Sequence, residues 1–212
     1  MKKSNFSKGI TKFWILTLLT LVITIADISL TFIGTPDLSR ESNPLIYTVG
    51  LGWEALITSN IIVTILFIGL YYYSFVRFKP TVIKCNGFKE FYSIINFNQP
   101  DKFIWTLYKM PKNKLAYSYL LACGGFLTAL VSILRIRAVL EWIGILTNSE
   151  FAYSYFRLIQ NISFVTPIGR FDMILFLLFP TMFACIYWYY KQYKINKSAL
   201  KNQNNNLPVP II

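Results

Sequence analysis

The sequence contains no histidine and few acidic residues, with nine Asp and Glu against 21 Lys and Arg. Histidine is the commonest general base and a usual ligand of haem, zinc and copper in proteins. The three cysteines lack the paired spacing that would indicate a zinc site or a disulfide. We therefore expect neither a cofactor nor an enzyme, because any chemistry would depend on carboxylates, hydroxyl groups, Lys or Arg.

Charged residues are also scarce for a soluble protein, at 14% of the chain, whereas 55% of the residues are hydrophobic and 17% are aromatic. This composition is too apolar for a soluble domain and is typical of a membrane protein. The net charge of +12 fits the same class, because helical membrane proteins concentrate Lys and Arg in their cytoplasmic loops. We therefore expect the lipid bilayer as a partner and no binding of nucleic acid.

Four apolar runs reach the length of about 20 residues that a helix needs to cross a bilayer. They are residues 13–33, 53–75, 115–134 and 171–190. The first run is longer than the apolar part of a signal peptide and lacks a cleavage site, so we interpret it as a retained helix. The expected fold is an all-α membrane protein with four transmembrane helices in a single domain, residues 1–190. We expect the polar, Asn-rich tail, residues 191–212, to be cytoplasmic and disordered.

The loops predict the orientation of the chain in the cell membrane. Of the 21 Lys and Arg, 16 fall on the side that holds both termini and the middle loop, and five on the other side. The positive-inside rule therefore predicts a multi-pass protein with both termini in the cytoplasm. In the middle loop, residues 88–110 carry aromatics at helical spacing on either side of Pro100, which predicts two amphipathic helices on the membrane surface. The aromatic stretch of the outer loop, residues 141–169, predicts a similar surface position.

The first apolar run contains a stripe of polar residues within the stretch "LTLLTLVITIADISLTF". The α-helix turns once every 3.6 residues, so spacings of three and four place these residues on one face. An aspartate in the bilayer costs about 2.5 to 3.5 kcal/mol, so we expect this face to point into the protein. Its members are Thr17, Thr20, Thr24, Asp27 and Thr31.

Depth in the bilayer suggests which side chains could meet Asp27. Asp27 and Asn60 each lie about 10 Å from the outer ends of their helices, and Thr128 lies about 10 Å below Arg135 in the third helix. Arg135 and Arg137 are long enough to reach toward Asp27. Two interpretations remain open: an outward-facing polar pocket that binds a ligand, or an ion pair that fixes the register of the helices. In the same helix, a pair of glycines at residues 124–125 would let a neighbouring helix approach closely.

The stretch "DISLTFIGTPDLSRESNPLI" resembles the signature of an uncharacterised prokaryotic membrane family that is catalogued as a domain of unknown function. In that family the first helix carries Asp-x-x-x-Thr and the following loop carries Glu-x-Asn-Pro-Leu. The matching residues are Asp27, Thr31, Glu41, Asn43, Pro44 and Leu45. The family often has a lysine early in the second helix, where this chain has Asn60. The resemblance implies a polar site that includes Glu41 and Asn43, and it implies no activity.

Three functions from different classes follow from these patterns. The first is a non-catalytic subunit of a larger membrane complex, with other membrane subunits or a second copy of the chain as partner. The second is a small transport or ligand-binding protein that uses Asp27 in a polar pocket. The third, an intramembrane enzyme that pairs Asp27 with Asp172, is the least favoured, because Asp172 lies at the outer border without a catalytic context. We prefer the first.

Overall fold

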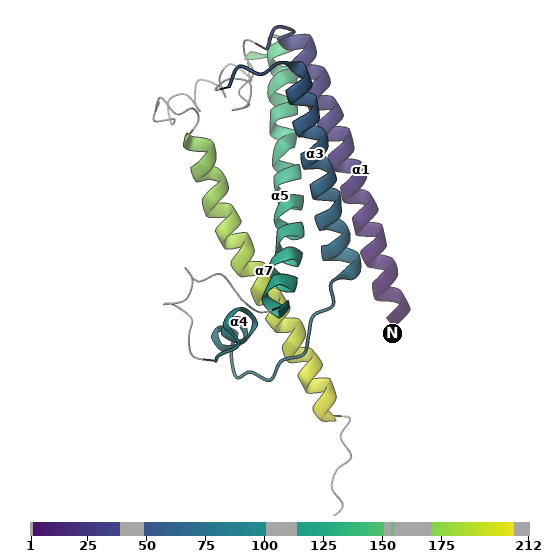
Figure 1. The fold of residues 1–212 in the computed structure, drawn as a ribbon, viewed down its shortest axis with the longest axis vertical. Helices are drawn as coiled ribbons and strands as arrows, with labels where there is room; N and C mark the ends of the chain where they lie inside the picture. Colours follow the sequence, from purple (N-terminus) through teal and green to yellow (C-terminus); the bar gives the residue numbers. More distant parts are fainter. Residues whose placement is uncertain (1, 39–48, 101–113, 151–153, 155–170, 206–212) are drawn as a thin grey trace, which may run out of the picture.

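The computed structural model describes residues 2–38, 49–100, 114–150, 154 and 171–205. These residues form helices and no strands, which confirms the all-α class. Figure 1 shows α1, α3 and α5 running side by side, while α7 lies beside α5 at one end and diverges from it toward the other. The elements are α1 (Lys2–Gly34), α3 (Trp53–Tyr72), the π-helical turn η1 (Tyr73–Arg77), α4 (Phe88–Phe97), α5 (Lys114–Leu146) and α7 (Phe171–Asn205).

Three helical segments are long and apolar enough to cross a membrane. They are Ser7–Gly34, Trp53–Arg77 and Lys114–Leu146. Their outward faces expose large apolar side chains such as Trp14, Leu18 and Leu66, whereas several threonines are buried between the helices. Apolar groups on the outside and polar groups on the inside are the arrangement that a lipid environment favours. The three segments therefore indicate a membrane protein.

Helix α5 is longer than the sequence predicted. The third span was predicted over residues 115–134, and α5, which contains it, continues to Leu146. Arg135, the first residue after the predicted span, is paired with Asp27 inside the bundle. The last helix, α7, contains the predicted fourth span, but it is not among the three segments above, so that span stays a prediction.

The beginning of the polar tail differs from the expectation of disorder. Residues 191–205 form the C-terminal part of α7. Within this part the side chain of Asn196 is buried, and its amide exchanges two hydrogen bonds with the backbone of Ile83, at 2.7 and 2.8 Å. The loop between η1 and α4 therefore packs against a helix that sequence composition alone did not indicate.

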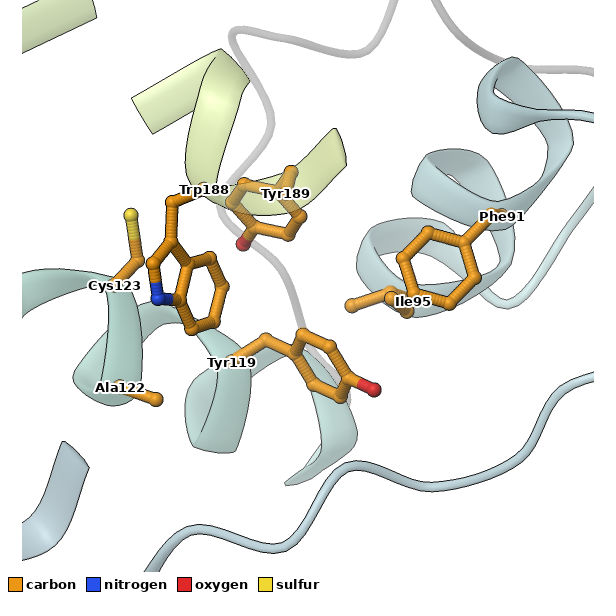
Figure 2. Close-up of a cluster of buried hydrophobic side chains, with 7 residues drawn as sticks. All are labelled: Phe91, Ile95, Tyr119, Ala122, Cys123, Trp188 and Tyr189. Carbon is orange, nitrogen blue, oxygen red and sulfur yellow. The ribbon is translucent and has the colours of Figure 1, made fainter. Parts of the chain in front are cut away.

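Helix α4 is the described part of the predicted surface segment. It begins after Gly87 and ends at Asn98, which has a left-handed backbone with a φ of 54° that favours a helix end. The apolar face of α4, formed by Phe91 and Ile95, is buried against α5 and α7 (Figure 2). This face therefore packs on protein, and the position of α4 at the membrane surface stays a prediction. The second predicted surface helix, residues 101–110, and most of the outer loop lie outside the described residues.

Helices α3 and α5 approach each other closely at Gly125. A Cβ atom added to Gly125 would collide with the backbone carbonyl of Leu70 and the side chain of Ser74. One turn away, the Ser74 hydroxyl donates a 2.8 Å hydrogen bond to the backbone carbonyl of Ala122. The predicted close approach at the glycine pair is thus confirmed for Gly125, and it sets the distance between the two helices.

Candidate functional site

The polar stripe of α1 faces the interior of the bundle, as its spacing predicted. The side chain of Asp27 is 22% exposed, although it lies within an apolar helix. Residues on the opposite face of α1, including Leu18, Val22 and Ile25, are exposed. The buried members of the stripe are Thr17, Thr20, Thr24 and Thr31, each 7% exposed or less.

Asp27 meets a guanidinium group from α5 toward the C-terminal end of this stripe. Arg135 donates hydrogen bonds from Nη2 to Asp27 Oδ2 at 3.1 Å and to Asn60 Oδ1 at 2.8 Å. Its Nη1 atom donates to the Thr24 hydroxyl at 3.3 Å. We call Thr24, Asp27, Asn60 and Arg135 the arginine cluster. It joins α1, α3 and α5 through one cation.

Neighbouring groups hold the partners of Arg135 in position. The amide of Asn60 donates a 2.9 Å hydrogen bond to the backbone carbonyl of Leu56, which fixes the side chain so that its oxygen is available to Arg135. The Thr24 hydroxyl lies 3.5 Å from the hydroxyl of Thr64 in α3. Because the carboxylate of Asp27 opposes the guanidinium directly, the cluster carries no net charge when both groups are ionised.

A second polar group lies deeper in the same bundle and centres on Tyr71, which is completely buried. Its hydroxyl lies 2.6 Å from Ser132 Oγ and 3.1 Å from Thr20 Oγ1, and it donates to the backbone carbonyl of Thr128 at 3.2 Å. Thr20 also donates to Ser132 at 3.2 Å. We call Thr20, Tyr71 and Ser132 the hydroxyl cluster. It again joins α1, α3 and α5, so two separate layers of hydrogen bonds link the same three helices.

The other predicted site residues fall in different places. Thr128 belongs to the layer of the hydroxyl cluster, and its own hydroxyl donates to the carbonyl of Gly125 in the same helix. Thr31 is buried on the same face of α1 as Asp27. Glu41, Asn43 and the side chain of Arg137 lie outside the described part of the chain, so their predicted place in the site is untested.

Sequence reasoning did not include Tyr71 or Thr64 among the site residues. Tyr71 stands within a run of three tyrosines, and only one of the three hydroxyls reaches the interior of the hydroxyl cluster. The only available signal was indirect. Polar atoms in lipid need hydrogen-bond partners, and the α1 stripe has more hydroxyl groups than the second helix had identified polar partners for them. The rotation of α3 about its axis determines which tyrosine hydroxyl can form hydrogen bonds with them.

The arrangement is suited to holding helices together and, at its exposed edge, to contacting a polar group. The Nη1 and Nη2 atoms of Arg135 make three hydrogen bonds, all to partners from the same chain. Among the described residues, no group of three or more His, Cys, Asp or Glu could hold a metal ion. Interhelical hydrogen bonds in membrane proteins contribute about 0.6 kcal/mol each on average. The two clusters therefore contribute a few kcal/mol together.

No protein-family model, curated protein or solved structure matches this chain. The resemblance of the region around Asp27 and Asn43 to an uncharacterised membrane family therefore stays a prediction.

Proposed function

We propose that this chain is a small multi-pass membrane protein that acts as a non-catalytic component of a larger membrane assembly. In this proposal α7 is a fourth transmembrane helix, and both termini lie in the cytoplasm. The single observation that carries the proposal is the engagement of Arg135 by Thr24, Asp27 and Asn60. The charged groups of the bundle serve to join its own helices, which is the behaviour of a scaffold.

The course of α7 supports a role in assembly. Figure 1 shows the middle of α7 beside the beginning of α5, its C-terminal part continuing past that end of α5, and its own beginning well separated from α5. Helices in a bilayer associate through van der Waals packing and interhelical hydrogen bonds, and the separated part of α7 has room to make such contacts with another protein helix. We therefore expect the partner to be an integral membrane protein that packs beside the first half of α7, with a second copy of this chain as the alternative occupant.

Purification from native membranes in mild detergent tests this proposal. We expect an affinity-tagged chain to bring down one integral membrane protein in a fixed ratio, measured by quantitative mass spectrometry. The matched control is a tagged membrane protein of similar size and expression level, which should not retain that partner. Recovery of the chain by itself, after chemical cross-linking in the membrane has failed to capture a neighbour, would contradict the role of a subunit.

Thiol labelling in intact cells tests the proposed topology. Cys85 lies in the loop before α4, and Ser198 is an exposed residue near the end of α7. A membrane-impermeant maleimide added outside should label neither Cys85 nor, in a Cys85→Ser chain, the thiol introduced by Ser198→Cys. Labelling of both after membrane permeabilisation is the positive control. External labelling of Ser198→Cys without labelling of Cys85 would show that α7 does not cross the bilayer.

A second candidate, ligand binding or transport, is favoured by one observation. About a fifth of each partner in the central ion pair remains exposed, 21% for Arg135 and 22% for Asp27. An incoming polar group could therefore reach the pair. If Asp27 binds a proton, cation or amine, the Asp27→Asn chain should fold normally and lose cation-dependent binding or uptake. Unchanged uptake in Asp27→Asn would remove this candidate.

A further inference from the structure

Two cysteines that are far apart in the sequence lie in contact between α5 and α7. The sulfur atoms of Cys123 and Cys185 are 3.4 Å apart, and neither cysteine is in a disulfide. Cys123 is buried, whereas Cys185 is partly exposed. The sequence spacing had suggested no such pair, so this contact is a product of the fold.

The thiols lie in the aromatic interface that attaches α7 to the bundle. Figure 2 shows Cys123 beside Trp188, with Tyr119 and Tyr189 adjoining. The rings of Tyr119 and Trp188 meet edge to face at a centroid distance of 6.1 Å. Such contacts hold a helix less firmly in lipid than in water, because lipid offers an equally apolar surface. A covalent bond at this point would change how strongly α7 is attached.

We propose that Cys123 and Cys185 form a redox-active thiol pair whose oxidation to a disulfide fastens α7 to α5. The oxidant is a second disulfide, and the reaction is thiol–disulfide exchange. Cys185, the more exposed thiol, loses its proton and attacks one sulfur of the oxidant, which releases one reduced thiol. Cys123 then loses its proton and attacks Cys185 in the mixed disulfide, and the second thiol of the oxidant leaves. The pair gives up two electrons and two protons, which reduce the oxidant to two thiols.

The two sulfur atoms are close to bonding distance. A disulfide needs its sulfur atoms about 2.05 Å apart, so the two thiols, now 3.4 Å apart, must approach by about 1.4 Å. Cys123 lies nine residues after Lys114, the first residue of α5, or about 14 Å along the helix. The pair is therefore inside the apolar part of the helix, and its natural oxidant must act from within the membrane or on a transient opening of the α5–α7 interface.

The test uses the full chain in lipid nanodiscs and the lipid-soluble reagent 2,2′-dipyridyl disulfide. To remove the third thiol, the parent protein carries Cys85→Ser. We expect about two equivalents of thiopyridone to be released per chain, no retained pyridyl adduct, and a peptide that links Cys123 to Cys185 in mass spectra. The Cys123→Ser variant should instead keep a stable adduct on Cys185, whereas Cys185→Ser should react at least tenfold more slowly, because the remaining thiol is buried.

Hydrogen exchange in α7 reports on the attachment of this helix without the Cys123→Ser and Cys185→Ser variants. Oxidation of the parent should slow hydrogen exchange in residues 180–190 of α7, while exchange in α1 stays unchanged, and a reductant should reverse the effect. Two separate pyridyl adducts on the parent, or thiols that remain unreacted when the chain is fully folded, would overturn the proposal. So would a linked peptide whose formation leaves exchange in α7 unchanged.

Discussion

Nη2 of Arg135 lies 3.1 Å from Asp27 Oδ2 and 2.8 Å from Asn60 Oδ1, so one nitrogen atom in α5 binds both α1 and α3. A sliding or rotation of any of the three helices by one residue would break at least one of these bonds, since each residue adds about 1.5 Å and 100°. In lipid the freed groups would find no water. We therefore expect the arginine cluster to fix the register of the three helices relative to one another.

The hydroxyl of Tyr71 stabilises the deeper layer of the bundle. We expect Tyr71→Phe to lower the free energy of unfolding by about 1 kcal/mol, because it removes contacts with Thr20, Ser132 and the carbonyl of Thr128. The loss stays modest, since Thr20 and Ser132 still bind each other. The neighbouring Tyr72 is 46% exposed, so Tyr72→Phe is a matched control that should change little. Equal effects in a denaturant titration would refute the assignment of the inward hydroxyl to Tyr71.

The paired glycines of α5 should respond in opposite directions to the same substitution. Gly125→Ala forces a methyl group against the Leu70 carbonyl and Ser74, and we expect a loss of about 1 to 3 kcal/mol from overpacking. A Cβ at Gly124 would meet only Leu70 Cδ2 at 3.8 Å, an ordinary contact. Gly124→Ala should therefore be neutral or stabilising, because alanine favours the helix by up to about 1 kcal/mol. A thermal melt that ranks the two variants the other way would show that α3 and α5 do not cross at Gly125.

The loop before α4 gives a pH-dependent prediction. Burial raises the pKa of the Cys85 thiol, the nearby Glu90 carboxylate raises it further, and a hydrogen bond from Asn196 lowers it. A raised pKa means less thiolate at a given pH, and the thiolate is the nucleophile. Labelling of Cys85 by iodoacetamide should therefore be slow at neutral pH and accelerate as the pH rises through the raised pKa.

Glu90→Gln isolates the electrostatic part of this effect. The glutamine keeps an oxygen that can accept the hydrogen bond now given by the Asn86 N–H, but it removes the negative charge. The pKa of Cys85 should fall, so labelling should be faster at neutral pH and its pH profile should move to lower pH. Glu54→Gln, at an exposed position at the start of α3, is the control and should leave the profile unchanged. A profile that is the same in both variants would remove Glu90 as a cause.

The sequence was sufficient to predict the inward face of α1, because the spacing of its threonines and Asp27 depends only on helix geometry and on the cost of polar groups in lipid. It also suggested Asn60 and Arg135 as partners from their depth in the bilayer. Both predictions were reached without knowing the rotation of α3 or α5. They succeeded because a carboxylate in an apolar helix has few possible partners.

The remaining contacts depend on how helices distant in the sequence are rotated and packed. Nothing local distinguishes Tyr71 from the two tyrosines that follow it, and nothing local brings Cys123 to Cys185. The full length of α5 was not indicated either, since the helix continues to Leu146, beyond the predicted span of residues 115–134. The expectation of disorder after residue 190 was wrong for residues 191–205, which are helical. In this part of α7, Asn196 is buried against the loop before α4, a contact that the polar composition did not indicate.

A double-mutant cycle on Asp27 and Arg135 tests most directly whether the polar stripe stabilises the packing of the helices. Removing one partner of a buried pair costs about 3 to 5 kcal/mol, and we expect about 2 kcal/mol here for Asp27→Leu or Arg135→Leu, since each side chain is about one fifth exposed. Asp27→Asn should cost less, because it keeps an oxygen for Arg135. The measurement is the free energy of reversible unfolding in mixed micelles for the two single variants and the double variant. We predict that the double variant loses clearly less free energy of unfolding than the sum of the two single losses. Single losses that add up to the double loss within about 0.5 kcal/mol would contradict the prediction.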